Sequence, residues 1–189
     1  MYVALDLETT GLDSDRHQVL EFGAVFNDFT KPVRKCDIYR EAVDPGGDIV
    51  GNAFALQMNA KLLREIATTA CPILEDVLIG FSTWLRAHGI GRDLKATLVG
   101  KNIGSFDVQF LNRVRYWPGE WLSYRYLDVG SQWATTEGIS GQAKLCKEVA
   151  ERHGLVGVEH TAVYDAQVSL ALAREKWFND DNYDYEWLL

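Results

Sequence analysis

The chain opens with Tyr2-Val3-Ala4-Leu5-Asp6-Leu7-Glu8-Thr9-Thr10-Gly11, and this stretch decides the fold that we expect. Its apolar residues predict a β-strand over Tyr2 to Glu8, in which side chains two apart share a face and lie roughly 6 to 7 Å apart. Asp6 and Glu8 therefore project side by side from an otherwise apolar strand. In poorly solvated surroundings the two carboxylates repel one another and each loses hydration. We expect a positive partner, and a divalent metal ion is the obvious candidate.

Length and composition indicate one globular unit. The 189 residues are 47% hydrophobic, which is ample for one core. We expect one domain over residues 1–178 and an acidic-aromatic tail over 179–189. The sequence has no run of about 18 apolar residues, so we expect no membrane contact. Asp6 and Glu8 stand where a secretory signal would place its basic and apolar regions, and we therefore expect a cytoplasmic protein.

The cysteines support neither a disulfide framework nor a zinc site. They are odd in number, far apart and without a CxxC spacing: Cys36, Cys71 and Cys146. We expect small buried side chains in a reducing compartment.

The net charge of −8 argues against a protein that coats duplex nucleic acid, because such proteins usually carry a basic stripe. Four of the negative charges, however, fall in the last ten residues, at Asp180, Asp181, Asp184 and Glu186. A bound pair of divalent ions would offset four more. The charge that remains is close to zero. The net charge is therefore compatible with a protein that binds one strand end through metal ions.

The order of the predicted elements indicates a mixed α/β sheet with helices packed on it. After the first strand, apolar patterns and turn residues predict strands near 19–27 and 34–43. Helices are expected over 59–67, 72–88, 106–116, 144–153 and 163–178, with short strands over 96–100 and 124–129.

Two further acids are expected to point inward from helices. Asp107 lies in the first turn of its predicted helix, on the same stripe as the apolar Leu111 and Val114, and Asp165 is placed in the same way on the last helix. Each acid alone has a plain alternative role, since a carboxylate near a helix N-terminus is favoured by the helix dipole. Four inward-directed carboxylates together favour a shared site.

His160 precedes Asp165 by five residues, just ahead of the last helix. A histidine with a pKa near neutrality can take a proton from water, as hydrolysis beside a metal cluster requires. A lone histidine is more often a surface or core residue than a catalytic one. The four acids expected near His160 favour a catalytic role. His17, His88 and His153 follow a turn or end helices, and we interpret them as structural.

Three motifs resemble those of the DEDDh 3'-5' exonucleases, the group that includes DnaQ-like proofreading domains, RNase T and oligoribonuclease. They occur in family order and span residues 6 to 166. They are Asp6-x-Glu8-Thr9-Thr10-Gly11-Leu12, Gly100-Lys101-Asn102-Ile103-Gly104-Ser105-Phe106-Asp107 with Phe110-Leu111, and His160-Thr161-Ala162-x-x-Asp165-Ala166.

The resemblance implies a ribonuclease H-like fold, with a five-stranded mixed sheet flanked by helices. It implies a metal-dependent 3'-5' exonuclease that hydrolyses phosphodiester bonds at the 3' end of single-stranded DNA or RNA and releases nucleoside 5'-monophosphates. By the same resemblance, Asp6, Glu8, Asp107 and Asp165 would hold two Mg²⁺ or Mn²⁺ ions, and His160 would be the general base.

The residues that follow the first strand are expected to touch the terminal nucleotide: Thr9, Thr10, Gly11 and Leu12, together with Asn102 of the second motif. For the first four, an ordinary strand-ending turn is an equal alternative. Glu21, in the middle of the second strand, is a further acid, for which we favour a supporting or structural role over direct metal ligation.

The aromatic cluster over 116–121 and 124–126 gives the main substrate clue. Its rings could stack unpaired bases, with Arg125 on phosphate, but core packing or an oligomer interface is the stronger interpretation for most of them. The stretch from Tyr124 to Val129 resembles an oligoribonuclease segment, whereas Thr9-Thr10-Gly11 is closer to the proofreading and RNase T branches.

These clues leave substrate and partners open. The nucleic acid, its length, and a homodimer or polymerase partner are not decided. The alternatives to the main hypothesis are an oligoribonuclease-like enzyme for short RNA, an inactive nucleic-acid-binding relative, and a phosphohydrolase for nucleotides.

Overall fold

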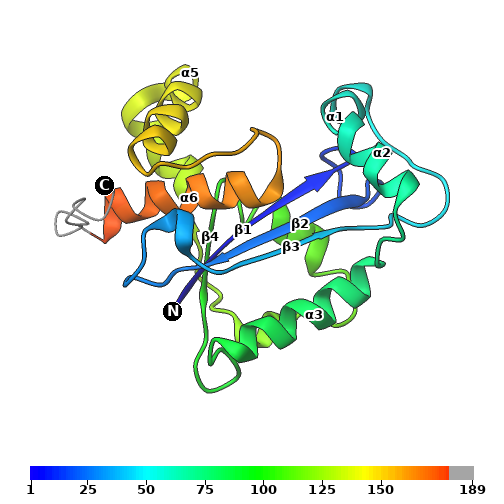
Figure 1. Cartoon of the computed structure of the whole chain (residues 1–189), viewed down its shortest axis with the longest axis horizontal. Coiled ribbons are helices and arrows are strands. Elements are labelled where there is room, and N and C mark those ends of the chain that lie inside the picture. Colours follow the sequence, from blue (N-terminus) through cyan, green and yellow to red (C-terminus); the bar gives the residue numbers. More distant parts are fainter. Residues whose placement is uncertain (179–189) are drawn as a thin grey trace.

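The computed structural model describes residues 1–178, and over 133–142 it describes the backbone without side chains. The predicted tail, 179–189, lies outside the described residues. One mixed sheet has the strand order β3-β2-β1-β4-β5, with β1 and β2 antiparallel, β2 and β3 antiparallel, and β1, β4 and β5 parallel (Figure 1). The strands are β1 Tyr2–Thr9, β2 Val19–Phe26, β3 Ile38–Ala42, β4 Thr97–Gly100 and β5 Leu127–Asp128.

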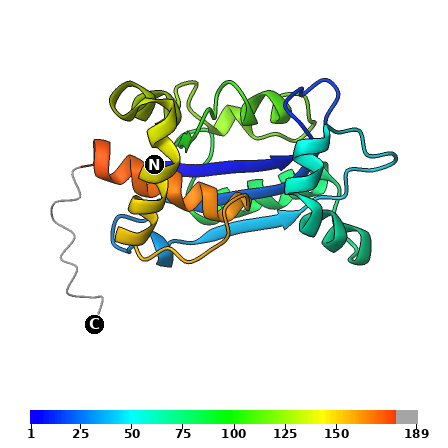
Figure 2. The same ribbon diagram turned by 90° about the horizontal axis from the view of Figure 1, so that it is seen from above.

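Helices cover both faces of this sheet, with α3 on one side and α6 on the other (Figures 1 and 2). The α-helices are α1 Ala53–Met58, α2 Ala60–Thr68, α3 Leu74–Ala87, α4 Asp107–Leu111, α5 Val129–Arg152 and α6 Ala162–Trp177, and the short 3₁₀ turns are η1 Val33–Lys35 and η2 Gly119–Trp121. This five-stranded mixed sheet flanked by helices confirms the predicted fold class. Within residues 1–178, no helix is both long and apolar enough to cross a bilayer.

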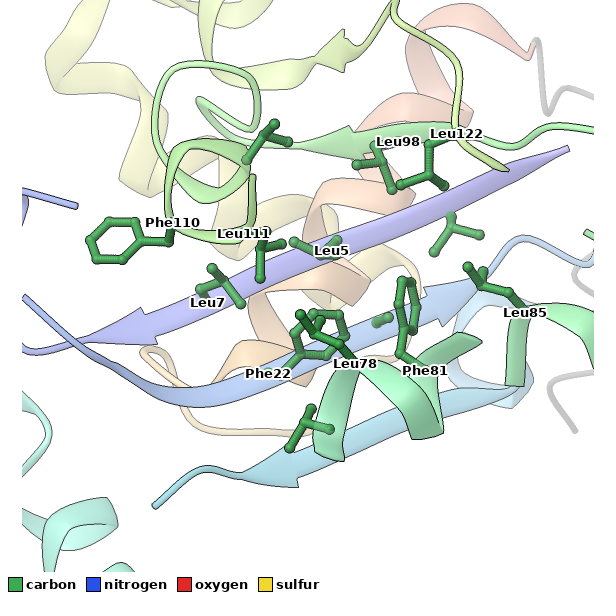
Figure 3. Packing of buried hydrophobic residues seen from close by; sticks show 14 of the residues in the cluster. Leu5, Leu7, Phe22, Leu78, Phe81, Leu85, Leu98, Phe110, Leu111 and Leu122 are labelled. Carbon is green, nitrogen blue, oxygen red and sulfur yellow. The ribbon is translucent and has the colours of Figure 1, made fainter. Parts of the chain in front are cut away.

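The central strand β1 divides its side chains between the two cores. Val3, Leu5 and Leu7 face the core beneath α3 and α4, where they pack with residues such as Phe22 (Figure 3). Ala4 faces the core under α5 and α6. Because side chains alternate along a strand, Asp6 and Glu8 follow Ala4 onto the α6 side.

A glycine on β2 brings α6 close to the sheet. A Cβ atom on Gly23 would lie 2.4 Å from the carbonyl carbon of Ala162 and 2.5 Å from the backbone nitrogen of Val163. No side chain fits there, so the first turn of α6 rests directly on β2. Since Asp6 pairs with Gly23 in the β1–β2 register, this contact carries Asp165 toward Asp6.

Three elements are shorter in the structure than predicted. The helix predicted over 106–116 ends at Leu111, ahead of a segment in which Tyr116 has a positive φ of 73° and Pro118 follows closely. The strand predicted over 34–43 begins at Ile38, because Pro32 starts the turn η1. The strand predicted over 124–129 shortens to Leu127–Asp128.

Two helices were missed or begin earlier than expected, and side-chain caps explain both. Asp128 accepts a hydrogen bond from the Ser131 amide and starts α5 at Val129, well before the predicted residue 144. Asn52 accepts from the Ala55 amide and starts the unpredicted α1. Of the three cysteines, Cys36 is buried as expected, whereas Cys71 and Cys146 are partly exposed.

Candidate functional site

Four carboxylates converge at the carboxyl end of β1. Asp6 and Glu8 come from β1 itself, Asp107 is the first residue of α4, and Asp165 lies in the first turn of α6. Each of the other three carboxylates acts electrostatically on Asp6. The structure thus brings together the four acids that the sequence singled out.

The backbone of β1 fixes the position of the Asp107 side chain. It is 1% exposed, and its Oδ1 atom accepts a hydrogen bond of 2.9 Å from the backbone amide of Leu7. Leu7 points into the opposite core, so its amide lies between the Asp6 and Glu8 side chains along the chain. This contact locks α4 to β1 at the site.

Burial raises the pKa of every member of the cluster, and the charges of nearby carboxylates add to the shift. Burial, and then the charges of Asp107, Asp165 and Glu8, raise the pKa of Asp6 well above its usual value. Burial raises the pKa of Glu8 to about 7, against a hydrogen bond from Asn59. Burial also raises the pKa of Asp107 to about 8, against the hydrogen bonds from its own amide and that of Leu7.

The pKa of Asp165 is subject to opposing influences. Burial raises this pKa, while the nearby charges of His160 and Lys101 and the hydrogen bond from the His160 amide act in the opposite direction. For Asp6, by contrast, every cause of the shift acts to raise the pKa. Among the described residues, no positive group therefore lowers the pKa of Asp6.

His160 completes the site from the segment before α6. Its backbone amide donates a 3.1 Å hydrogen bond to Asp165 Oδ2, and its φ of 64° is left-handed, a conformation that is uncommon outside glycine. Ligand atoms of Glu8, His160 and Asp165 all lie within 4.8 Å of one another. The ring, on an exposed residue, stands at the mouth of the acid cluster, where water can reach it.

The donor set fits a divalent cation of the hard, oxygen-binding kind. Carboxylate oxygens are the ligands that Mg²⁺ and Mn²⁺ prefer, and a cation among these four groups would remove the repulsion that raises their pKa values. Asp6, Glu8, Asp107 and Asp165 are thus the residues that could hold metal.

Glu21 is satisfied within the chain, unlike its neighbour Glu8, with which it pairs across β1 and β2. It is 2% exposed and accepts from the Ala162 amide at 2.7 Å and from Arg40 at 2.6 Å. Arg40 also donates to both carboxylate oxygens of Glu65 on α2. This clamp joins β2, β3 and α2 to the residue that starts α6.

The residues expected to touch a nucleotide lie in different environments. Leu12 is 79% exposed beside the site, and Asn102 is exposed with a left-handed φ of 59°. Thr10 is fully buried, and its hydroxyl donates to the Val50 carbonyl and accepts from the Gln18 amide. Thr9 donates from its hydroxyl to the carbonyl of Gly11.

Sequence reasoning missed Asn59 and Arg40. Asn59 is 4% exposed, donates to the Thr9 carbonyl at 3.2 Å and lowers the pKa of Glu8. Its position directly before α2 looks like a plain helix start, so its sequence context carries no signal. Gly23 was a usable signal, because a glycine in a buried strand indicates a close backbone approach.

The aromatic cluster divides into core and surface. Trp117 stacks on Phe81 with ring centroids 6.1 Å apart, and Trp121 and Tyr126 also pack against the core. Tyr116 and Tyr124 are 50% and 79% exposed. Core packing, the stronger interpretation of the sequence, is therefore right for three of these rings.

Solved nucleases share this fold. Cell-death related nuclease 4 (CRN-4) aligns with a TM-score of 0.60 and 16% identity, over 92% of this chain and 62% of that one. A full-length 3'-exonuclease aligns at 0.66 and 17%, over 95% and 60%. The nuclease domain of 3'hExo, a DEDDh family member bound to rAMP, aligns at 0.64 and 16%, over 96% and 92%.

These likenesses confirm the DEDDh exonuclease fold that the motifs predicted. The chain spans about three fifths of the length of the first two proteins and nearly all of the 3'hExo nuclease domain. No protein-family model matches the sequence, and a search of curated proteins gives no match.

Proposed function

We propose that this protein is a metal-dependent 3'-5' exonuclease that hydrolyses phosphodiester bonds at the 3' end of single-stranded nucleic acid. One observation carries the proposal: four carboxylates from β1, α4 and α6 meet with raised pKa values beside the accessible His160. The shared fold with 3'-exonucleases supports it.

The acid cluster is the proposed metal site. Asp6, Glu8, Asp107 and Asp165 would hold two divalent ions, Mg²⁺ or Mn²⁺, which when bound stabilise the charge that develops on the attacked phosphate and the leaving oxygen. The hydrogen bond from the Leu7 amide keeps Asp107 aimed at the site, and burial excludes bulk water from Asp107. These contacts preorganise the site before substrate arrives.

His160 is the proposed general base. Its ring takes a proton from the attacking water as the water oxygen bonds to phosphorus. The bond from phosphorus to the 3' oxygen of the preceding nucleotide breaks, and that oxygen is protonated on release. The products are a nucleoside 5'-monophosphate and a strand shorter by one residue. Asp165, which accepts from the His160 amide, positions the segment that carries the ring.

The terminal nucleotide is proposed to lie on the segment that follows β1. The exposed side chain of Leu12 offers an apolar contact for the last base. Thr9, Gly11 and Asn102 are the further proposed contacts. Thr10 would support the shape of this segment, because its hydroxyl, amide and carbonyl are all hydrogen-bonded within the chain. A cytoplasmic location and a homodimer or polymerase partner stay predictions.

Incubation with a 5'-labelled single-stranded oligomer in Mg²⁺ or Mn²⁺ tests this function. We expect a ladder that shortens from the 3' end, and His160→Ala should slow it by on the order of 10² to 10⁴-fold. The matched control is His88→Ala, which removes a histidine at the carboxyl end of α3 and should leave turnover unchanged. Intact DNA and RNA oligomers in both metals would refute the proposal, and they would favour the inactive, strand-binding alternative.

A further inference from the structure

A second pocket lies beside the edge strand β5, away from the carboxyl end of β1. Its volume is about 730 Å³, and it is bordered by β4 and by the segment from Trp117 to Tyr126. The apolar side chains of Leu98 and Leu122 lie next to one another at its base (Figure 3). Most of the aromatic cluster that the sequence singled out thus surrounds one hollow.

Two of the aromatic walls are fixed by the core. The Trp117 ring lies parallel to Phe81, with an interplanar angle of 7°. Tyr126 packs against Gly104, where an added Cβ would come within 2.8 Å of its ring. Rings that are held in place in this way can receive a flat ligand at little cost in conformational entropy.

A third ring is open to solvent. Tyr124 is 79% exposed, and the guanidinium carbon of Arg125 lies 5.2 Å from its ring centroid. An exposed tyrosine beside an arginine offers a stacking face for a base, together with a positive charge for the adjoining phosphate.

Polar groups and charge favour an anionic, hydrogen-bonding ligand. Lys95, Thr97, Asn112 and Ser123 border the pocket, and none of its ten lining residues is acidic. In the described part of the chain no carboxylate forms an ion pair with Lys95. This is unusual surface for a chain of net charge −8. Another pocket, of about 310 Å³, includes Asp44 and Glu75.

The short helix α4 links this pocket to the acid cluster. Asp107 begins α4, and Asn112, which borders the pocket, follows its last residue. A rise of 1.5 Å per residue separates Asp107 and Asn112 by about 8 Å. The far border of the pocket is more distant from the acid cluster. Thr97 pairs with Tyr2, four residues before Asp6 on β1. Lys95, which borders the pocket, lies two residues beyond Thr97. At about 3.3 Å per strand residue Lys95 is roughly 20 Å from Asp6, so at about 3.4 Å per nucleotide the pocket spans roughly the second to the sixth nucleotide.

We propose that this pocket binds one unpaired nucleotide of the substrate strand, upstream of the 3' nucleotide held at the acid cluster. Its base stacks on Tyr124, and Lys95 and Arg125 contact its flanking phosphates. The inference rests on the proposed function, since it assigns the second site to the same strand. It gives that function a substrate preference: strands long enough to reach the pocket bind more tightly than dinucleotides.

Fluorescence anisotropy in Mg²⁺, with every variant made in the slowly reacting His160→Ala background so that the metal ions that hold the 3' end stay bound, measures this preference directly. The probes are labelled single-stranded dinucleotides and octanucleotides, as DNA and as RNA. Tyr124→Ala should weaken octanucleotide binding by about 5- to 100-fold, the range for loss of one base–aromatic stack, and leave dinucleotide binding unchanged. Lys95→Ala should weaken octanucleotide binding and lower the slope of log affinity against log salt by about 0.7.

Tyr116→Ala is the matched control. Tyr116 is also exposed and has an arginine, Arg115, 5.0 Å from its ring centroid, but it does not line the pocket. Equal octanucleotide affinity in the Tyr124 and Tyr116 variants would overturn the inference, as would a change of oligomeric mass in the Tyr124 variant, which would assign the surface to protein contact. Turnover in Mg²⁺ separates the two proposals, because wild-type protein that shortens neither oligomer contradicts the proposed function instead.

Discussion

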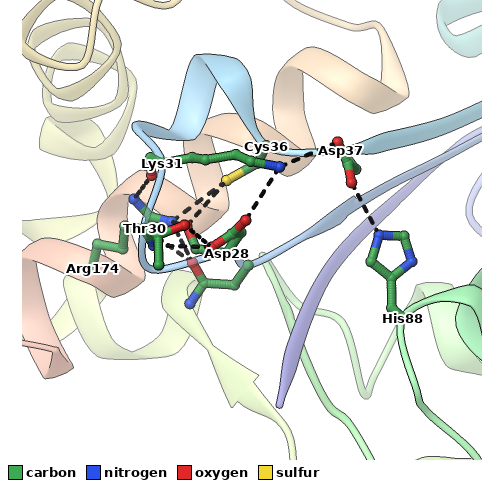
Figure 4. Close-up of polar contacts among 8 residues, drawn as sticks. Asp28, Thr30, Lys31, Cys36, Asp37, His88 and Arg174 are labelled. Atoms are coloured by element: carbon green, nitrogen blue, oxygen red, sulfur yellow. Dashed lines mark hydrogen bonds and ion pairs between the residues drawn. The ribbon is translucent and has the colours of Figure 1, made fainter. Parts of the chain in front are cut away.

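The two ends of α6 handle buried charge in opposite ways. Near its carboxyl end, Arg174 is 1% exposed and donates to Asn27 Oδ1 and to the backbone carbonyls of Asp28 and Lys31, at 2.6 to 2.9 Å (Figure 4). At its amino end, Asp165 joins three other acids and has a raised pKa. The charge at the carboxyl end is stabilised by hydrogen bonds within the chain, whereas the acids at the amino end stay destabilised by burial and repulsion.

This difference separates structural charge from functional charge. A buried ion that is fully hydrogen-bonded fixes the packing of its neighbours, here the loop from Asn27 to Cys36 on α6. A cluster of like charges whose hydrogen bonds do not offset burial and repulsion costs stability, and we interpret it as a site that awaits a ligand. Glu21 and Glu8 repeat the contrast across one strand pair, with Glu21 held by Arg40 and Ala162 and Glu8 left with a pKa of about 7.

The largest expected effect follows from removing one charge of the acid cluster. Asp107→Asn keeps an oxygen for the Leu7 amide but removes a carboxylate, so turnover should fall by on the order of 10³-fold or more. The metal-free variant should unfold at a higher temperature than wild type, because one repelling charge is gone. Exonuclease rates and metal-free melting curves measure both. The exposed Asp93→Asn is the control, and a variant that loses activity and stability together would contradict this account.

The other end of α6 should respond in the reverse sense. Arg174→Met removes the guanidinium that donates to Asn27 Oδ1 and to the carbonyls of Asp28 and Lys31, which should lower the free energy of unfolding by about 3–5 kcal/mol. Turnover per folded molecule should stay at the wild-type level below the melting temperature. Urea denaturation measures the stability, with the exposed Arg64→Met as control. A loss below about 1 kcal/mol would show that the cluster at Arg174 is not structural.

Glu21 should affect the turnover rate only by positioning the start of α6 and His160. Arg40 and the Ala162 amide donate to different oxygens of Glu21, and Glu21→Gln replaces one of these oxygens with an NH₂ group that cannot accept, so the start of α6 and His160 should shift. We expect kcat to fall by about 10- to 100-fold with little change in KM. Glu65→Gln, at the exposed end of the same clamp, should change kcat by less than about threefold. Equal effects of the two variants would remove Glu21 from the positioning role.

A further expected effect is the pH dependence of stability without metal. Because Glu8 and Asp107 have folded-state pKa values of about 7 and about 8, against 4.5 and 3.8 in the unfolded chain, the folded state holds more protons between these limits. The contribution of these two groups to stability is therefore fully present below about pH 4 and is lost as the pH rises toward 8, a loss of at least about 3 kcal/mol. Urea titrations in EDTA measure this slope. It should disappear in saturating Mg²⁺, and a rising slope would contradict the raised pKa values.

The sequence predicted the elements whose signals are local. Alternation of apolar residues located β1 and β2, and the inward stripe and spacing of Asp107 and Asp165 placed both acids at the site. The motifs added the five-stranded sheet. What failed depended on single caps and turns, as where Asp128 starts α5 early and Pro32 shortens β3.

Contacts between distant segments could not be predicted. Glu21 accepts from the Ala162 amide, 141 positions away in the sequence, and Asn59 donates to the Thr9 carbonyl, 50 positions away. No sequence periodicity predicts either contact. The pocket beside β5 is a similar case. The sequence shows its aromatic residues, but only the fold separates the rings that pack in the core from the one that faces solvent.

The melting temperature as a function of Mg²⁺ or Mn²⁺ tests the central claim most directly. If the four carboxylates lack only a cation, saturating metal should raise the melting temperature of wild type, with about 2.7 kcal/mol of stabilisation at a hundredfold excess over the dissociation constant. Arg174→Met should show the same gain from its lower starting point, and Asp107→Asn should show little. An unchanged wild-type melting temperature in both metals would contradict the account.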